Sequence, residues 1–308
     1  MSSIVILGTL EQGLMYSLMV LGVYLSFRIL NYADLTADSS FTLGAATAAS
    51  LITSGFNPWL ATLIAFFAGC LAGTFTGILH TKFKITPLLS GILTMIALYS
   101  INLRVMGKAN ISLLRMRTIF SDFSTFTHME EYSVIILSII TVSIIGLIIY
   151  FFLETELGLA LRATGDNEIM IRSQGVNTDI MKISGLAISN GLIAFSGSYV
   201  AQNQLFADVS MGIGIIVIGL ASVIIGEVLI GTSSIGRTVL AVLCGGVIYR
   251  IIIAIVLQLG LRATDLKLIT ALIVIIALIS PQIKNKLTPI YEKIQNKLTP
   301  LHKEKDKE

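Results

Sequence analysis

The amino-acid sequence predicts an all-α fold, a polytopic transmembrane bundle of helices. Of the 308 residues, 55% are hydrophobic and only 13% are charged, and the mean hydropathy is +0.87. Soluble domains carry about 25% charged residues, so this chain has too few polar side chains to cover a surface that faces water. Apolar runs long enough to cross a bilayer also recur along most of the chain. These observations exclude a soluble globular domain.

Nine apolar runs are candidate membrane spans, because a helix of about 20 mostly apolar residues crosses the hydrocarbon core. The runs cover residues 7–30, 40–54, 58–79, 87–106, 133–153, 183–202, 211–230, 238–257 and 268–281. The second and the last are short, as tilted, re-entrant or broken segments would be, so the bundle has about eight to ten spans. No hydrophilic stretch is long enough to bury a core of its own. Residues 1–283 therefore form one transmembrane domain, followed by a basic tail at residues 284–308.

The distribution of charge predicts how the chain is oriented in the membrane. The net charge of +3 lies wholly in the tail, where seven Lys accompany four acidic residues. Because short cytoplasmic loops are enriched in Lys and Arg, we expect a cytoplasmic C-terminus. Counting spans back from it places the loop at residues 154–182 on the same side and the N-terminus outside. The cytoplasmic side then also holds Arg28, Lys82, Lys84 and Arg237, and the opposite side holds Arg104, Lys108, Arg115 and Arg117.

A dense polar run separates the first two apolar segments. Asp34 and Asp38 lie four residues apart, so a helix would present both on one face. Non-helical backbone at membrane depth is tolerated only beside protein or a water-filled cavity, so a broken helix here would border a translocation pathway. An ordinary cytoplasmic loop is the alternative. Together with Ser39 and Asn31, the two aspartates are candidate residues of the pathway or its gate.

Two later apolar runs carry small or polar residues at helical spacing. Gly69, Gly73 and Gly77 form a face on which another helix can approach closely. We expect this face to pack within the subunit or between two copies of it. Asn190 and Gln202 place amide groups in the sixth run and are further candidates for the pathway or gate.

The loop at residues 154–182 contains the signals of a short helix. Asp166 or Asn167 can cap the N-terminus of a helix, and Glu168 suits its positive end. Gly175 suits the left-handed position that follows a helix. We therefore expect a helix at residues 167–174 that exposes Ile169 and Met170. Such an apolar cluster indicates contact with a partner's groove, and packing onto the chain's own spans or the lipid headgroups is the alternative.

This loop resembles the coupling loop of permeases of ABC importers of the branched-chain amino acid and ribose type. The similarity rests on Arg162-Ala-Thr-Gly165, Asp166-Asn167 and Arg172-Ser-Gln-Gly175-Val176, and it continues through residues 177–202, 211–214 and 219–227. Residues 31–41, Asn-Tyr-Ala-Asp-Leu-Thr-Ala-Asp-Ser-Ser-Phe, are similar to permeases paired with aromatic amino acid binding lipoproteins.

The resemblance implies a role for the short helix. In that family a coupling helix lies in a groove of the ATPase subunit and transmits the closing of two ATPases to the membrane spans. Carried onto this sequence, the role falls to Gly165, Asp166, Asn167, Glu168, Ile169, Met170, Arg172 and Gly175. We hypothesise that Ile169 and Met170 fill the groove while Glu168 and Arg172 make polar contacts at its rim.

The resemblance also implies the partners and the location of the chain. These are two ABC ATPase subunits, a second permease copy, an extracellular solute-binding lipoprotein and the lipids of a bacterial cytoplasmic membrane, with no nucleic acid. ATP and Mg²⁺ would be bound by the partner ATPase, so this chain is expected to hold no cofactor and no metal. The solute would be an amino acid, with tyrosine or tryptophan favoured and a branched-chain amino acid as the alternative.

Two acidic residues lie in or beside the seventh apolar run, where ionisable groups are costly and often functional. Glu227 is expected near the cytoplasmic end of that run, where it would pair with Arg237 or Arg250 or reach the headgroups. Asp208 is expected at the outer mouth, where it would meet a binding protein or solvent. Both are candidates for the pathway or gate.

No catalytic arrangement is visible in the sequence. His80 and His128 lie in predicted loops and His302 lies in the tail, none of them beside a Ser or Cys placed as a nucleophile, and no Walker-type loop is present. We therefore expect a transport subunit and no enzyme. The competing interpretation is an ion-coupled secondary transporter acting alone, with Asp34, Asp38 or Glu227 as its proton or sodium site. A channel-forming membrane protein is a further alternative.

Overall fold

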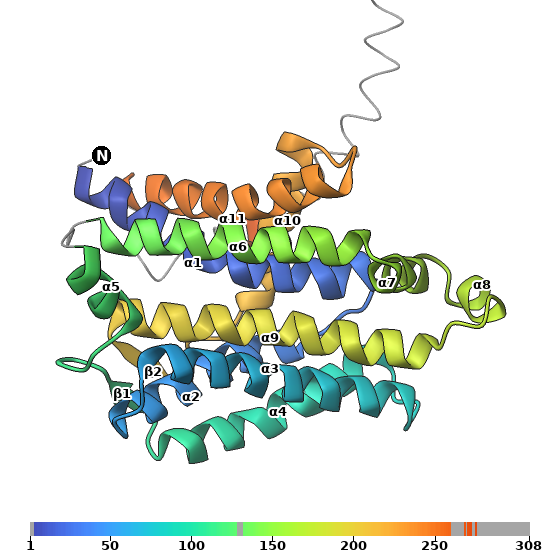
Figure 1. Ribbon diagram of the computed structural model, residues 1–308, viewed down its shortest axis with the longest axis horizontal. Helices are drawn as coiled ribbons and strands as arrows, with labels where there is room; N and C mark the ends of the chain where they lie inside the picture. The colour runs from blue at the N-terminus through green and yellow to red at the C-terminus, as the bar shows by residue number, and fades with distance from the viewer. Residues whose placement is uncertain (1–2, 128–131, 260–267, 269, 273–274, 276–308) are drawn as a thin grey trace, which may run out of the picture.

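The computed structural model describes residues 3–127, 132–259, 268, 270–272 and 275. The predicted tail at residues 284–308 and most of the ninth predicted span lie outside these residues. The described chain is almost wholly helical (Figure 1). Its helices are α1 Ser3–Val23, which continues as the π-helical segment η1 Tyr24–Ile29, α2 Thr36–Thr53, α3 Pro58–Thr81, α4 Pro87–Met106, α5 Ile119–Thr127, α6 Ser133–Glu154, α7 Glu156–Asp166, α8 Glu168–Ser173, α9 Thr178–Gln204, α10 Ile215–Ile230 and α11 Ile235–Gln258.

The all-α membrane bundle predicted from the sequence is confirmed. Within the described residues, 6 helices are long and apolar enough to cross a membrane. They are α1 with η1, α3, α4, α6, α9 and α11. The apolar α10 is shorter, and α2 falls outside this set although 13 of its 18 residues are buried. The reason is that α2 is rich in alanine and polar residues and packs against α3, α4 and α9, so it needs no lipid-facing side chains.

A two-stranded ladder, which the sequence does not predict, closes one end of the bundle. Strands β1 Asn110–Ser112 and β2 Phe206–Asp208 pair antiparallel, with Asn110 opposite Asp208. They lie at the end opposite α8 (Figure 1). With three residues each, the strands are too short to show an alternating pattern of polar and apolar residues.

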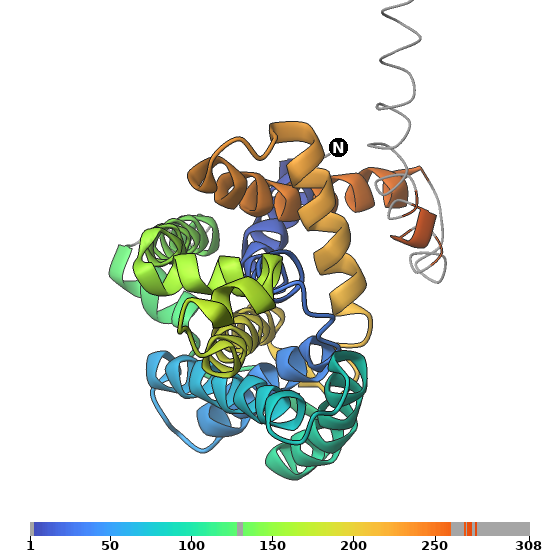
Figure 2. The ribbon, with the colours of Figure 1, turned by 90° about the vertical axis from the view of Figure 1, so that its right-hand side faces the viewer.

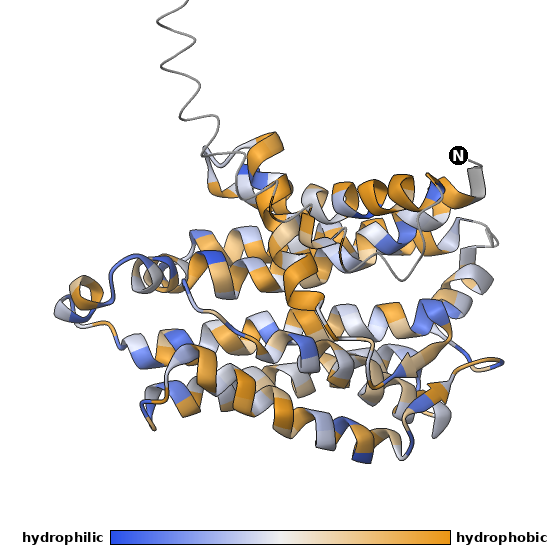
Figure 3. Ribbon diagram, turned by 180° about the vertical axis from the view of Figure 1, so that it is seen from behind, coloured by the Kyte–Doolittle hydropathy of each residue, from blue (hydrophilic) through white to orange (hydrophobic). Residues whose placement is uncertain are grey.

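Helix α9 is the central element of the bundle. Seen from the end that carries α8, it lies among the other helices, with α6 to one side of it and α3 to another (Figure 2). Its closest neighbours are α3, α2 and α1. Apolar residues cover much of the outer faces of the helices, and hydrophilic residues are frequent toward the two ends (Figure 3). Exposed side chains such as Phe67 and Leu71 on α3 and Ile144 and Phe151 on α6 form the surface expected to face lipid.

The glycine face of α3 packs against α9 within the subunit. A methyl group on Gly73 would overlap the carbonyl oxygen of Leu186, and one on Gly69 would overlap that of Asn190. A methyl group on Gly77 would come within 2.9 Å of the Cα atom of Ile183. The two backbones therefore approach closely, as small residues allow in membrane bundles.

The charged loops gather at the two ends as the sequence predicts. One end of the bundle holds α7, α8 and three further points of the chain. These are the C-terminus of η1 beside Arg28, the C-terminus of α3 before Lys82 and Lys84, and the turn between α10 and α11 before Arg237. The other end holds the N-terminus of α1, the α4 terminus after Arg104, and β1. The N-terminus of α1 therefore lies at the end opposite α8, and the side of the membrane that each end faces stays a prediction.

The close approach of α3 and α9 predicts that Gly73→Ala destabilises the protein. The added methyl group has to push the two backbones apart, which costs about 1–3 kcal/mol in a packed core. The midpoint of thermal unfolding of the purified protein should fall accordingly. Gly8→Ala on α1 is the matched control, since nothing lies within 4 Å of a methyl group there, and it should leave the midpoint unchanged or raise it. Equal midpoints for the two variants would contradict the packing.

Candidate functional site

The loop at residues 154–182 folds as two short helices at one end of the bundle. Thr155 caps α7 by accepting the N–H of Gly158 at 3.2 Å. Asn167 ends α7 and caps α8 by accepting the N–H of Met170 at 3.0 Å. Gly175 follows α8 with φ +88°, a conformation that glycine adopts without a steric penalty. The helix predicted at residues 167–174 is therefore confirmed, with Asn167 as its cap and Asp166 as the last residue of α7.

The apolar side chains of α8 are divided between the solvent and the protein. Ile169 is 85% exposed and Met170 is 48% exposed, whereas Ile171 is buried. In the last turn of α7, Gly165 lies against the backbone carbonyl of Ile29, which any side chain at this position would overlap. The two helices are thus fixed to the end of η1 while α8 presents an apolar tip outward.

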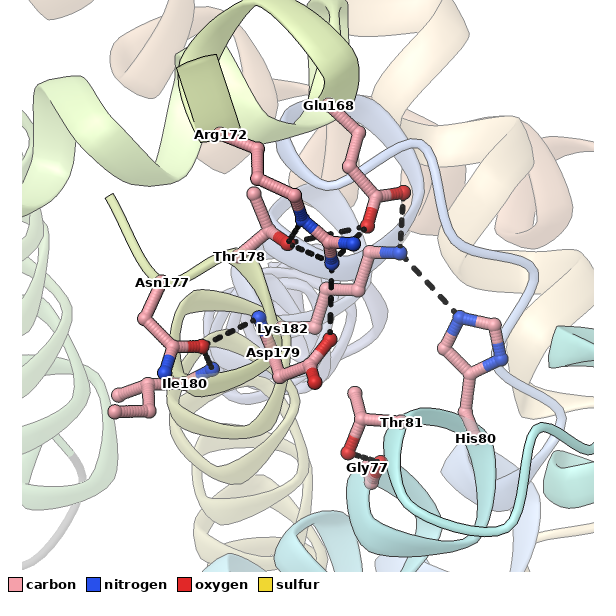
Figure 4. A network of polar contacts seen from close by, with 10 residues as sticks. All are labelled: Gly77, His80, Thr81, Glu168, Arg172, Asn177, Thr178, Asp179, Ile180 and Lys182. Carbon is pink, nitrogen blue, oxygen red and sulfur yellow. Dashed lines mark hydrogen bonds and ion pairs between the residues drawn. The ribbon is translucent and has the colours of Figure 1, made fainter. Parts of the chain in front are cut away.

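A polar network holds α8 against α9 (Figure 4). Glu168 accepts from the ammonium of Lys182 at 2.7 Å and from the guanidinium of Arg172 at 3.2 Å. Arg172 also donates to the hydroxyl of Thr178 at 2.6 Å and pairs with Asp179 at 3.4 Å. The hydrogen bond from Lys182 holds the pKa of Glu168 below its usual value. Glu168 and Arg172, expected to contact a partner, thus have partners within the chain, since their i, i+4 spacing brings them together.

The network continues from Lys182 to the turn between α3 and α4. The ammonium of Lys182 lies 3.5 Å from Nε2 of His80, and Nδ1 of His80 lies 2.8 Å from the carbonyl oxygen of Ile85. His80 belongs to the last turn of α3, which corrects the loop expected for it. Its ring meets the edge of the Tyr32 ring with centroids 5.2 Å apart. A chain of contacts therefore runs from α8 to the segment between η1 and α2.

That segment is a break in the helix at membrane depth. The backbone at residues 31–35 is not helical, and Asn31 has φ +51°. Asp34, only 1% exposed, accepts the N–H of Thr36 at 2.9 Å and the amide of Asn190 at 2.6 Å. Asn190 accepts in turn from the hydroxyl of Ser40 at 2.7 Å. The expectation that Asp34 and Asp38 share one helix face is wrong, because Asp34 lies before the first residue of α2.

A second break, at residues 205–214, precedes α10. Asp208 accepts the N–H of Ser210 at 2.8 Å, the same local turn that Asp34 makes with Thr36. The segment then passes beside α2, where the carboxylate of Asp38 accepts the N–H groups of Gly214 and Ile216, each at 2.9 Å. Asp38 thus caps the N-terminus of α10 from another helix. Both interrupted helices are held by carboxylates that lie in or beside the break from α1 to α2.

The other predicted pathway residues are placed as follows. Glu227 pairs with Arg28 at 3.0 Å, not with Arg237 or Arg250 as expected. Arg250 lies 3.7 Å over the ring of Tyr16 and donates to Gln12 at 3.5 Å, both on α1. Gln202 donates to Thr62 at 2.8 Å and accepts from the N–H of Ile119 at 3.1 Å, so it ties α9 to two other segments.

Asp208 lies at the end opposite α8, in β2. The hydroxyl and the N–H of Ser210, together with the amide of Asn110 at 3.2 Å, lower its pKa. The hydrogen bond from Asn110 to Asp208 therefore joins the side chains of β1 and β2. Among the described residues, no group of three His, Cys, Asp or Glu is placed to hold a metal ion.

Lys182, Thr178, His80 and Tyr32 belong to the site, although the sequence did not single them out as site residues. Lys182 marks the end of the predicted loop, and nothing in the sequence indicates its bond with Glu168, 14 residues earlier. His80 and Tyr32 meet only through the packing of separate helices. The one signal in the sequence for this site was the positive charge of Lys182, which follows a loop that contains acidic residues and helix-capping residues.

The fold and the site together define a class of protein. A bundle of apolar helices, with a non-helical segment between η1 and α2, combines with a braced helix that projects from one end. This arrangement is that of a multi-pass membrane protein, and it fits a permease subunit.

The chain belongs to the family described as branched-chain amino acid transport system, permease component, which it matches over residues 5–279. It is 47% identical over 270 residues, 88% of this chain and 89% of the relative, to a tyrosine transport system permease protein of Clostridioides difficile. It is 34% identical over 280 residues, 90% of this chain and 97% of the relative, to an uncharacterized protein of Rickettsia prowazekii. It is 25% identical over 235 residues, 75% of this chain and 70% of the relative, to a ribose import permease of Haemophilus influenzae. No solved structure matches the chain.

The family establishes the class of function predicted from the sequence. The chain is a permease component of an ABC-type transport system, and permeases of this kind are transport subunits, not enzymes. Such permeases work with ATPases and binding proteins. The apolar helices and the family together make it a multi-pass membrane protein.

The bond between Glu168 and Lys182 predicts that Lys182→Met loosens α8. The variant keeps the length of the side chain and removes the ammonium, so Glu168 loses its closest partner. Backbone amides of residues 168–173 should exchange hydrogen with deuterated water about tenfold faster, which corresponds to about 1.4 kcal/mol of lost protection.

Glu156→Gln is the control for this measurement, since Glu156 lies in the first turn of α7 and outside the network. It should leave the exchange of residues 168–173 unchanged. Unchanged exchange in Lys182→Met would show that the bond to Lys182 does not hold α8 in place and that its other contacts, those of Arg172 and the packing of Ile171, suffice.

Proposed function

We propose that this chain is the membrane-spanning subunit of an ATP-driven importer that carries an amino acid across the cytoplasmic membrane of a bacterium. The exposed apolar tip of α8, on a helix braced by Glu168, Arg172 and Lys182, is the observation that supports this most directly. In this proposal the end with α8 faces the cytoplasm, and the C-terminus is proposed to lie on the same side of the membrane because of the basic composition of residues 284–308. The described basic residues at that end agree with the positive-inside rule.

The tip of α8 has the properties of a contact that transmits force. Ile169 and Met170 offer an apolar contact that a groove on an ATPase can enclose. The network that ties α8 to α9 and to His80 makes the tip part of the bundle, so a displacement of the tip moves α9 as well. A loosely attached helix would absorb the movement instead.

The working assembly in this proposal contains two copies of the chain, two ATPase subunits and an extracellular binding lipoprotein. ATP and Mg²⁺ are bound by the ATPase partners. The importer direction follows from the ribose import permease among the relatives. An aromatic amino acid, with tyrosine first, follows from the relative that is a tyrosine transport system permease.

The competing function, an ion-coupled transporter acting alone, has less support. It needs a carboxylate free to take up and release a proton or a sodium ion. Asp34 is buried and accepts two hydrogen bonds, and Glu227 pairs with Arg28. Asp38 accepts two backbone N–H groups and keeps capacity for a cation, so the competing function is disfavoured chiefly by the family, whose permeases work with ATPases.

The proposal predicts that Ile169→Asp uncouples the transporter. A charged side chain in an apolar groove is strongly unfavourable, so ATP hydrolysis should no longer be stimulated by the loaded binding protein in a reconstituted complex. Ile169→Leu keeps the apolar tip and should retain at least about half of the wild-type stimulation, because such volume-conserving changes are tolerated. Full stimulation in Ile169→Asp would contradict the assignment of α8.

The source of energy gives a second prediction. Uptake of radiolabelled tyrosine into proteoliposomes should require the ATPase subunits and ATP, and collapsing the proton and sodium gradients should leave the initial rate unchanged. Uptake by the permease alone, driven by an ion gradient, would establish the competing function. Uptake of leucine but not tyrosine would keep the importer and change its solute.

A further inference from the structure

A cavity of about 390 Å³ opens between α2, α4 and the second helix break. Polar groups lie on the α2 side, where Asp38, Ser39 and Thr42 come from the first half of the helix. Apolar and aromatic groups form the remainder, chiefly Met95, Ile96 and Tyr99 of α4 together with Val209 and Ile213 of the break. The volume falls in the range of small-molecule sites, about 300–1,000 Å³.

The face of α4 that lines this cavity is unsuited to lipid. Tyr99 is 49% exposed, and its hydroxyl has no hydrogen-bond partner among the described residues. It lies 12 residues after Pro87, the first residue of α4, or about 18 Å along the helix axis, which is within the hydrocarbon depth. A phenol hydroxyl without a partner is costly in hydrocarbon. This face therefore suits a space that water or a polar group of a solute can enter.

Asp38 is the charged group of the cavity, and it is half-buried. Each of its oxygens accepts one backbone N–H, from Gly214 and from Ile216, and a carboxylate oxygen can accept a further bond. No Lys or Arg among the described residues pairs with it. The hydroxyls beside it already have partners, since Ser39 donates to the carbonyl of Met95 and Thr42 accepts from the N–H of Gly212. The group left to bind a ligand is a carboxylate that attracts a cation.

We propose that this cavity is a solute site of the pathway that takes a primary amine attached to an aromatic or large apolar side chain. The ammonium of the solute lies against Asp38. Its side chain lies among Ile96, Tyr99 and Ile213, where aromatic rings stack and the sulfur of Met95 contacts the ring edge. Among the described residues, no Lys or Arg lines the cavity, so a carboxylate on the solute contributes little to binding. The site rests on the proposed importer function and specifies which part of the solute the membrane subunit contacts.

The site is tested in the permease–ATPase complex in lipid nanodiscs, which leave both membrane faces open. Cys70 and Cys244 are replaced by Ala, and a single cysteine is introduced as Ile213→Cys or as the control Leu71→Cys. Both positions are exposed, by 64% and 71%, but Leu71 lies on the outer face of α3. A quaternary-ammonium methanethiosulfonate should modify Ile213→Cys at least about tenfold faster, because lipid excludes a charged reagent. Equal rates at the two positions would overturn the site.

Solute analogues then test the recognition of the amine. Tyrosine and tyramine should each slow the modification of Ile213→Cys by about twofold or more, since half occupancy halves the rate. 4-Hydroxyphenylpropionate, which lacks the amine, should not slow it. Adding Asp38→Asn should remove the protection by tyramine, with the protected rate compared with the unprotected rate of the same Asp38→Asn variant. Equal protection by the amine and the acid, or protection that survives Asp38→Asn, would overturn the role of Asp38.

These experiments distinguish a failure of the proposed site from a failure of the proposed importer function. Stimulated ATP hydrolysis with no amine-selective protection would remove the site and leave the importer standing. Amine-selective protection in a complex whose uptake does not depend on ATP would remove the importer and leave the site.

Discussion

Backbone groups inside a bilayer must find their hydrogen-bond partners within the protein, because no water is available to them there. This chain leaves the regular helix between η1 and α2, beside the middle of α9, and again between α9 and α10, where it passes from the ladder at the end of the bundle back to α2. Asp34 supports the first break and Asp38 supports the second, each by accepting backbone N–H groups. The positions of α2, of α10 and of Asn190 depend on these two carboxylates. The cavity beside Asp38 depends on them as well.

The break between η1 and α2 is also where the membrane interior meets the end that carries α8. Contacts lead from Glu168 through Lys182 and His80 to the ring of Tyr32, which lies two residues before Asp34. Tyr32 also shares a hydrogen bond with Ser90 of α4. A continuous set of side-chain contacts therefore links α8 to both walls of the cavity, α2 and α4.

Local features of this chain were predictable from the sequence, whereas contacts between distant segments were not. The caps at Asn167 and Gly175 act over a few residues, and so the short helix α8 was predicted correctly. The break near Asp34 was visible as a polar run between apolar ones. The partner of Glu227 was predicted wrongly, because Arg28 is 199 residues away in sequence while Arg237 is near. The ladder of β1 and β2 and the cavity beside Tyr99 likewise depend on how distant segments pack.

The contacts at the second break show how α10 is attached to the rest of the bundle. Helices α2, α3 and α9 meet backbone to backbone at Gly44, Gly69 and Gly73, where no space remains for a side chain. Helices α10 and α11 meet in the same way at Gly226 and Gly245. The segment before α10 meets α2 as closely, since Gly212 lies against the backbone carbonyl of Asp38, and the Asp38 side chain adds its two hydrogen bonds. The group that would hold the solute therefore also fixes the second break to α2, so a solute bound at Asp38 acts on the attachment of α10.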